Sequence, residues 1–407
     1  MATLADPQAQ ADPTEAFRLE AREWLAANFP AALRGRDGSM SAIEGAGELD
    51  PDQAAWKQAI GDKGWGVPTW PRQYGGGGLS RAEARVLGEE MARVGAFNPI
   101  AGSMGVMMFG PTLLEYGTEE QRQEHIPPIA RGDIRWCQGY SEPGAGSDLA
   151  SLQTFAEDRG DHYVVNGQKT WTSGGQWADK CFAIVRTDKT KKHEGITFML
   201  IDMKAPGVEV KPIRLISGQS PFCETFFTDV KVPKRDRIGE EGQGWTIGKR
   251  LLQHERSSLS GGGSAASRLF AGAPLGKLAK TYRGEDSEGR LSDADLRMRI
   301  VRHEMDSRAF ALTLRRAALE AKSNQGPSAA TSIFKNVGAR ITQDRAELGI
   351  EIMGMNGLGW EGEGFTEEEI TQTRTWLWGK AVSIYGGSTE IQNNVIAKRI
   401  LGMLDHQ

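Results

Sequence analysis

Apolar residues recur at helical spacing through the first third of the chain. One example is the series Ala84, Leu87, Met91 and Val94. Steps of three and four place such residues on one face of an α-helix. Glycines at 75–78 interrupt the pattern, and Ser80 can cap the helix that follows. A phosphate-binding loop is the alternative for these glycines, but no Lys-Ser/Thr pair follows them. We predict a helical domain over residues 1–132.

The pattern changes to short alternating runs between residues 133 and 242. Turn-forming residues separate these runs, which is typical of strands in an antiparallel β domain. The predicted strands are 162–165, 181–185, 196–201 and 225–230. The predicted turns are Asn166-Gly167, Ala205-Pro206-Gly207 and Val232-Pro233. We expect a β-barrel or sandwich.

Helical spacing returns over residues 243–407. The predicted helices include 294–323, 327–350 and 390–402, and the polar stretch 283–293 is expected to connect two helices. The order of helices, strands and helices predicts an α+β fold of three domains, 1–132, 133–242 and 243–407.

Composition excludes several classes of protein. The chain has 407 residues, of which 39% are hydrophobic and 25% charged, with a formal net charge of -4. These values are ordinary for a globular protein and give no basic excess for nucleic acid or an anionic membrane. No apolar run reaches the ~18 residues of a membrane span. Three widely spaced cysteines indicate a reducing compartment, so we expect a cytoplasmic protein, and no ligand spacing predicts a metal site.

Three motifs carry candidate chemistry. The first, WCQGYSEPGAGSD at 136–148, reads as a strand that runs into a turn of small residues, which exposes backbone N–H groups and hydroxyls. The second, NGQKTWTSGG at 166–175, adds an aromatic ring and further hydroxyls. The third, IYGGSTEIQ at 384–392, lies near the end of the chain.

These motifs, in this order and spacing, closely resemble the acyl-CoA dehydrogenases over nearly the whole chain. The resemblance implies an N-terminal helical domain, a middle β-barrel domain and a C-terminal four-helix bundle, with FAD between the last two. It also implies contacts to FAD from Gln138, Tyr140, Ser141, Trp171, Ser173, Ser388 and Glu390. Ser147 is expected to contact the CoA part of an acyl-CoA substrate.

The reaction that the resemblance implies needs a base for the α-proton. In many family members a glutamate follows the tyrosine of the third motif, but Tyr385 is followed here by Gly386. A candidate lies at Glu255, because Ile247, Leu251, Glu255 and Leu259 form one helical stripe. An apolar surrounding raises the pKa of a carboxyl above its usual ~4.3, which favours a base.

The Glu255-Arg256 pair also matches the placement of the catalytic glutamate in isovaleryl-CoA dehydrogenase and long-chain members of the family. A surface glutamate in a helical salt bridge is the alternative. Arg256 is expected to bind CoA or to structure the site. Gly386 and Gly387 leave open space for a branched or bulky acyl group.

The sequence lacks the Arg-x-x-Phe-Gly motif with which many members reach a partner subunit's FAD. Because it carries the candidate base, the chain resembles the large subunit of pimeloyl-CoA-type dehydrogenases. Two assemblies stay open, a homo-oligomer or a heteromer with a second acyl-CoA dehydrogenase-like subunit. The expected electron acceptor is an electron-transfer flavoprotein. An acyl-CoA oxidase, a desulfinase-like flavoprotein and a non-catalytic binding protein on the same scaffold are the alternative functions.

Overall fold

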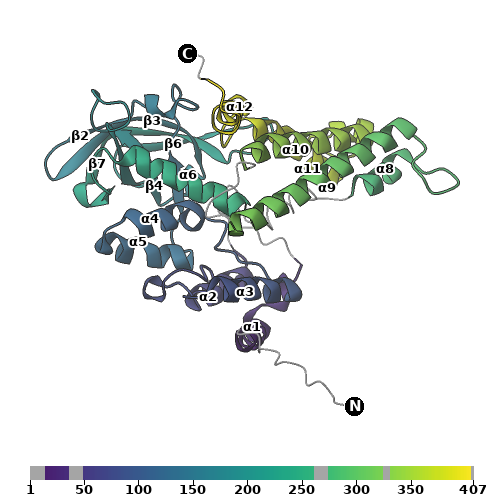
Figure 1. Ribbon diagram of the computed structural model, residues 1–407, viewed down its shortest axis with the longest axis horizontal. Coiled ribbons are helices and arrows are strands. Elements are labelled where there is room, and N and C mark those ends of the chain that lie inside the picture. The colour runs from purple at the N-terminus through teal and green to yellow at the C-terminus, as the bar shows by residue number, and fades with distance from the viewer. Residues whose placement is uncertain (1–13, 36–48, 261–273, 324–330, 405–407) are drawn as a thin grey trace. The chain divides into compact units, whose positions relative to one another are not determined.

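The computed structural model describes residues 14–35, 49–260, 274–323 and 331–404 (Figure 1). The chain divides into two compact units, which are described separately. Unit 1 comprises Met1–Ile213 and Pro221–Glu255, and unit 2 comprises Arg214–Ser220 and Arg256–Gln407. Within the described ranges, no helix has both the length and the apolar character needed to cross a membrane.

The described residues of unit 1 begin with five α-helices, in agreement with the predicted helical region. They are α1 (Glu15–Asn28), α2 (Pro51–Asp62), α3 (Arg81–Val94), α4 (Gly110–Tyr116) and α5 (Glu119–Arg131). Ser80 caps α3 as predicted and forms a reciprocal capping box with Glu83. The glycine run before it is a packing turn, since a Cβ on Gly76 would lie 2.3 Å from the carbonyl oxygen of Trp70.

Eight strands form one sheet in unit 1. They are β1 (Trp136–Gly139), β2 (Phe155–Asp158), β3 (His162–Ser173), β4 (Lys180–Arg186), β5 (Ile196–Asp202), β6 (Val208–Ile213), β7 (Phe222–Pro233) and β8 (Arg237–Ile238). The order is β6-β7-β3-β2-β4-β5-β8, with β1 beside β4. The sheet is mixed, because β1 and β2 pair with β4 in parallel. The predicted antiparallel pairing holds for the other neighbouring strands of the sheet.

The predicted turn at Asn166-Gly167 was wrong, because both residues lie inside the long strand β3. The pairing of β3 with β7 shifts register between Val165 and Gly167, which makes a β-bulge. The side chain of Asn166 accepts a hydrogen bond from the N–H of Asp229 at 2.9 Å and donates one to its carboxylate at 3.0 Å. Pairing with β2 and β7 on both sides keeps this turn-like dipeptide in the sheet.

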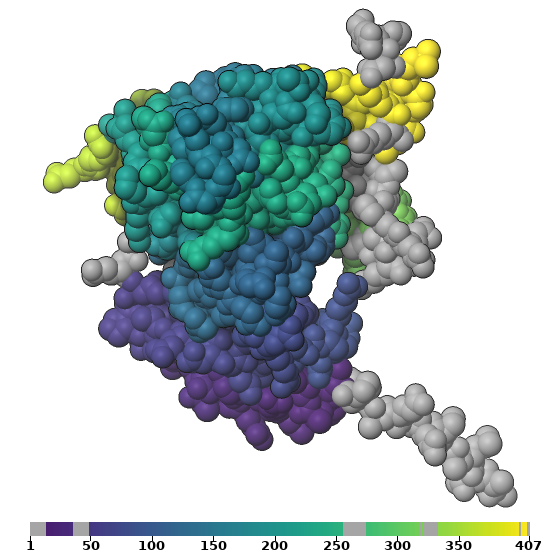
Figure 2. Space-filling view, turned by 90° about the vertical axis from the view of Figure 1, so that its left-hand side faces the viewer, coloured from purple at the N-terminus to yellow at the C-terminus, as the bar shows by residue number. Residues whose placement is uncertain are grey.

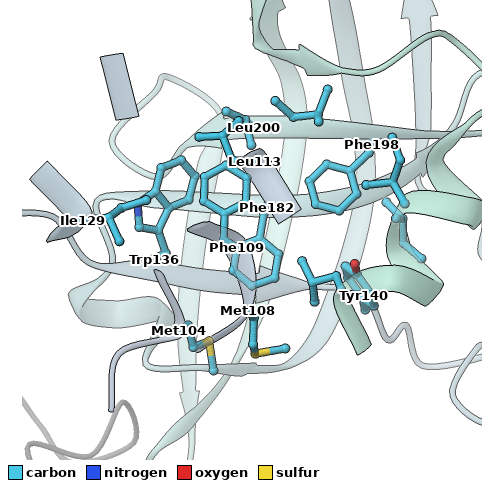
Figure 3. Close-up of a cluster of buried hydrophobic side chains, with 14 of the residues drawn as sticks. Met104, Met108, Phe109, Leu113, Ile129, Trp136, Tyr140, Phe182, Phe198 and Leu200 are labelled. Atoms are coloured by element: carbon cyan, nitrogen blue, oxygen red, sulfur yellow. The ribbon is translucent and has the colours of Figure 1, made fainter. Parts of the chain in front are cut away.

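A buried aromatic cluster joins the helices of unit 1 to the sheet (Figure 3). Phe109, just before α4, stacks on Phe182 of β4 and Phe198 of β5, with interplanar angles of 9° and 8°. Trp136 of β1 lies 4.2 Å from Phe109 between ring centroids. In the space-filling view the purple and blue N-terminal residues of unit 1 lie directly against its teal residues (Figure 2). The cluster therefore fixes β1, the strand of the first motif, against the helices.

Helix α6 (Gly244–Ser260) packs on the same cluster through Ile247 and Leu251, both fully buried. The three cysteines, Cys137, Cys181 and Cys223, are free thiols buried in the sheet. Burial raises the pKa of the Cys137 thiol well above its usual range, which keeps the group neutral.

Unit 2 is helical, as predicted. The helices among its described residues include α8 (Leu275–Arg283), α9 (Ala294–Ser323), α10 (Thr331–Met353), α11 (Glu367–Gly379) and α12 (Thr389–Val395). Helices α8, α9 and α11 each pack on α10. The polar connection predicted between helices is present, with a β-bridge between Glu285 and Leu291. Residues 327–330 of one predicted helix lie outside the described residues.

A buried carboxylate ties α1 to α3. Glu90 is 2% exposed and accepts hydrogen bonds from Arg18 at 2.9 Å, Arg22 at 2.8 Å and Arg93 at 2.7 Å. These arginine hydrogen bonds, above all that of Arg22, lower the pKa of Glu90 to about 2. The carboxylate thus stays charged at neutral pH and holds three cations together.

Replacing Glu90 with Gln should lower the free energy of unfolding by about 1–3 kcal/mol, because charge-assisted hydrogen bonds are lost. The folded-state pKa lies below the unfolded value, so the contribution is complete above about 4.5 and is lost as pH falls toward about 2. Urea unfolding of both proteins at pH 7 and pH 3 should show a smaller difference at pH 3. Glu89→Gln, on the exposed face of α3, is the control, and an equal loss in both variants would contradict the assignment.

Candidate active site

The first motif forms the end of β1 and the turn that follows it. The side-chain amide nitrogen of Gln138 is buried and has no hydrogen-bond partner among the described residues. Tyr140 is buried and packs edge-on against Phe182 and Phe198. The carbonyl of Ser141 accepts a hydrogen bond from the N–H of Thr170 at 2.9 Å. The turn of the first motif is thereby attached to the strand of the second.

A buried ion pair makes the same attachment through side chains. The Lys169 ammonium, 0% exposed, lies 2.8 Å from Oε1 of Glu142 and donates to the carbonyl of Tyr140 at 3.0 Å. The Glu142 carboxylate also accepts hydrogen bonds from the N–H groups of Gln153 at 2.6 Å and Thr154 at 2.9 Å. One carboxylate and one ammonium thus hold the first motif, the second motif and the start of β2.

Burial and pairing act in opposite directions on the two charged groups. Burial lowers the pKa of Lys169, although the Glu142 carboxylate opposes this. Burial favours a higher pKa for Glu142, but the charge and hydrogen bonds of Lys169 outweigh it and hold the pKa below its usual range. A buried charge without its partner is costly. The pair therefore fixes the relative position of the two motifs. Neither Lys169 nor Glu142 was among the predicted site residues.

Trp171 lies on β3 two residues beyond Lys169 and is turned out of the sheet. Its φ is +60°, a left-handed conformation that costs a residue other than glycine about 1–3 kcal/mol. The side chain is 55% exposed and contacts Phe222 edge-on with ring centroids 6.1 Å apart. Its neighbour Thr172 is fully buried. Buried residues on either side hold the indole in a strained, exposed position, so it is not a core tryptophan.

Two further residues predicted from the first two motifs also lie in unit 1. Ser173 ends β3 and is partly buried, in register with Phe222. Ser147 is exposed in the turn between β1 and β2. The hydroxyl of Thr172 is buried without a hydrogen-bond partner in the described part of the chain. Unit 1 thus brings together every predicted flavin contact of the first two motifs.

The third motif lies in unit 2. Ser388 caps α12, where its hydroxyl accepts a hydrogen bond from the N–H of Ile391 at 3.4 Å, and Glu390 lies in the first turn. Gly386 and Gly387 have φ values of +65° and +94°. A glutamate at position 386 would have to adopt a left-handed backbone, so the chain is built for glycine there.

The candidate base lies on α6. The first two residues of the predicted stripe, Ile247 and Leu251, are fully buried, as the pattern requires. Glu255 and Arg256 continue the helix, but their side chains, like that of Leu259, lie outside the described residues.

An ionic clamp holds the turn of α6 that precedes Glu255. Arg250 donates to both carboxylate oxygens of Glu115 on α4, at 2.8 and 2.7 Å. His254 lies 3.2 Å from the same carboxylate. Arg250, above all, keeps the pKa of Glu115 below its usual range, while burial lowers the pKa of His254. His254 thus belongs to the packing of α6 on α4.

Family models match three successive segments of the chain. The acyl-CoA dehydrogenase N-terminal domain matches residues 12–133, the middle domain 137–230 and the C-terminal domain 242–401. The chain belongs to the acyl-CoA dehydrogenase family. Members of this family are oxidoreductases. The exposed indole of Trp171, and the polar atoms of Gln138 and Thr172 that lack partners among the described residues, agree with such chemistry. The predicted boundaries 1–132, 133–242 and 243–407 stay a prediction.

Curated relatives cover almost the whole chain. Acyl-CoA dehydrogenase IpdE1 of Mycolicibacterium smegmatis is 36% identical over 404 residues, which span 95% of this chain and 97% of the relative. Acyl-CoA dehydrogenase IpdE1 of Mycobacterium tuberculosis is 34% identical, with 96% and 97% covered. The chain is thus an acyl-CoA dehydrogenase with relatives of similar length.

Solved structures show the same fold. The Tcur3481-Tcur3483 steroid ACAD is 30% identical with a TM-score of 0.73, and the match covers 97% of this chain and 99% of that one. The ChsE4-ChsE5 complex from Mycobacterium tuberculosis is 29% identical with a TM-score of 0.71, and both chains are covered completely. Both acyl-CoA dehydrogenase neighbours are named as pairs of proteins.

Replacing Lys169 with Met should lower the free energy of unfolding by about 3–5 kcal/mol, because the Glu142 carboxylate would stay buried without its cation. The double variant Lys169→Met with Glu142→Gln should lose less than the sum of the single losses. Urea unfolding of the three variants measures this coupling. Lys204→Met, which removes the exposed 2.8 Å pair with Asp179, is the control and should cost less than about 1 kcal/mol. Additive losses would show that the pair does not act as a unit.

Proposed function

We propose that this acyl-CoA dehydrogenase removes the α-proton of an acyl-CoA thioester with Glu255. The observation that carries the proposal is the buried stripe of α6, in which Leu251 and Ile247, one and two turns before Glu255, are 0% exposed. A carboxylate on such a face loses water and gains basicity toward a carbon acid. The left-handed Gly386 supports the same assignment, because the alternative base position carries no side chain.

The described residues fit an FAD ring. Gln138 supplies a buried amide nitrogen and Thr172 a buried hydroxyl, both without a hydrogen-bond partner among the described residues, and Trp171 supplies an exposed indole whose neighbours are anchored. Gln138, Tyr140, Ser141, Trp171 and Ser173 would hold the isoalloxazine, and Ser388 and Glu390 would contribute from unit 2. When bound, FAD supplies a hydride acceptor for the β-carbon of the substrate.

The protein residues bind and orient the thioester around this chemistry. Ser147 would contact the CoA portion, and Arg256 would bind CoA or brace the base. Gly386 and Gly387 would leave room beside the α-carbon for a branched or bulky acyl group. The name of the steroid ACAD neighbour supports testing ring-containing acyl groups beside straight, branched and dicarboxylic ones.

Electrons would pass to an electron-transfer flavoprotein. An acyl-CoA oxidase is the second candidate, because the fold neighbours include an oxidase that acts on a prolyl acyl carrier protein. Stoichiometric hydrogen peroxide during turnover in air would identify an oxidase, whereas reduction of an electron-transfer flavoprotein would identify a dehydrogenase.

We also propose a heteromer in which a second acyl-CoA dehydrogenase-like subunit completes the FAD site. The missing Arg-x-x-Phe-Gly motif supports this assembly, and so do the paired neighbours ChsE4-ChsE5 and Tcur3481-Tcur3483. Such a chain would carry the base and the ring contacts, while its partner would supply the missing contacts.

Glu255→Gln should reduce turnover about 10²- to 10⁴-fold, the usual contribution of a general base. Bound FAD should stay at the parent level, because the amide keeps the size of the carboxyl. Stopped-flow bleaching of the flavin by an accepted acyl-CoA measures the step directly. Glu363→Gln, an exposed residue between α10 and α11, is the control and should leave the rate unchanged. If the flavin of Glu255→Gln were bleached at the parent rate, Glu255 would not be the base.

The chain produced alone should contain less than one FAD per chain, and co-production with a second subunit of the same family should raise the ratio. Flavin absorbance against protein concentration gives the stoichiometry, and native mass spectrometry gives the subunit composition. Full and tight FAD occupancy in a homo-oligomer would show that no second kind of subunit is required.

A further inference from the structure

One carboxylate of α4 holds a complete turn of α6. The Glu115 carboxylate accepts two hydrogen bonds from the Arg250 guanidinium, from Nε at 2.8 Å and from Nη2 at 2.7 Å. The imidazole of His254 lies 3.2 Å from the same carboxylate. Residues 250 and 254 are four positions apart, so their side chains lie on one face of the helix. Glu115 thus restrains both ends of the last turn before Glu255.

The Glu115–Arg250 clamp adds a direction that apolar packing lacks. Leu251 is 0% exposed in the aromatic core, but the hydrophobic effect is non-directional and tolerates small rotations of a helix. An arginine–carboxylate fork has a fixed planar geometry, so it resists such rotations. The acceptor is itself held in place, because Leu113, two residues before Glu115, is 0% exposed in the same core. A directional contact to an anchored helix therefore sets the rotation of α6.

Small rotations of α6 matter for a base that projects from it. The backbone of Glu255 continues the helix directly after His254. The end of a helical side chain lies about 5–6 Å from the helix axis, so a turn of about 10° moves it by about 1 Å. A displacement of about 1 Å can slow an enzymatic step about 10²-fold. The clamp is thus placed where it can control the aim of the proposed base.

We propose that Glu115 and Arg250 are positioning residues for proton abstraction. They act through the orientation of Glu255, so they set the rate of proton removal and leave the affinity for the substrate unchanged. This inference rests on the proposed function, because it takes Glu255 as the base. The two side chains are 36% and 42% exposed, and ion pairs of such exposure contribute little to stability. Variants without the clamp should therefore fold.

The test uses the FAD-loaded enzyme and the variant Glu115→Gln with Arg250→Met, which removes the fork without changing the net charge. Stopped-flow bleaching of the flavin at increasing concentrations of an accepted acyl-CoA separates the limiting rate from the apparent Kd. The limiting rate should fall about 10- to 100-fold, while Kd and FAD content stay at the parent level. An acyl-CoA without β-hydrogens cannot be oxidised, so exchange of its α-protons in D2O reports proton removal alone and should slow by the same factor.

Three further variants make the result specific. The charge swap Glu115→Arg with Arg250→Glu should recover part of the rate, because it rebuilds an ion pair between the same positions. Arg250→Lys should stay slow, since an ammonium lacks the planar fork. Arg131→Gln, which removes a similarly exposed pair with Asp133 at 2.7 Å after α5, is the matched control and should bleach like the parent.

Two results would overturn the proposal. The first is a parent-like limiting rate in Glu115→Gln with Arg250→Met, or a loss in that variant that is confined to Kd. The second is a charge swap as slow as that variant together with a parent-like rate in Arg250→Lys, because the fork would then not orient the helix.

A double-mutant cycle distinguishes failure of this proposal from failure of the proposed function. If the clamp acts through Glu255, removing it in a Glu255→Gln background should cost nothing further. A further loss of the same size in that background would overturn the role of the clamp, while Glu255 would remain the base. Parent-like bleaching in Glu255→Gln would instead remove the base, and with it the positioning role of the clamp.

Discussion

The ammonium group of Lys169 has no access to water and depends on the carboxylate of Glu142, 2.8 Å away. The same carboxylate accepts two backbone N–H groups from the start of β2, so one buried charge pair joins three segments of the chain. Separating the pair would leave both charges buried without a partner, and the protein interior stabilises an unpaired charge poorly. The turn after β1 and the strand that carries Trp171 therefore have one relative position. Every proposed ring contact of the first two motifs lies on these segments.

The aromatic cluster around Phe109 supports α6, the helix that carries the proposed base Glu255. It packs the N-terminal helices, β1, β4, β5 and the first half of α6 into one core. Because α6 is held there by Ile247 and Leu251, and by the Arg250 clamp to Glu115, the helix has one rotation about its axis. A base on α6 is thus supported by the same core that supports β1. The role proposed for Glu255 depends on this common core.

Polar groups without partners and a strained backbone occur together at the edge of this core. The amide nitrogen of Gln138 and the hydroxyl of Thr172 are buried without hydrogen-bond partners in the described ranges, and Trp171 has a left-handed φ. Such features lower stability, and folded proteins retain them where a ligand or a reaction requires them. Their position beside the anchored Lys169 is the physical basis for placing a flavin ring there.

The sequence by itself determined the family, the helix and strand content and the Ser80 cap, because these depend on periodicity and on residues close together in the chain. It also predicted the apolar stripe of α6. Only the tertiary structure decided that Asn166-Gly167 lies inside a strand, since β2 and β7 pair on both sides of it. Likewise, the parallel pairing of β1 with β4 joins residues 44 positions apart, and the Lys169–Glu142 pair joins residues 27 positions apart. No local pattern encodes which distant charge or strand will meet another, because burial and packing make that choice.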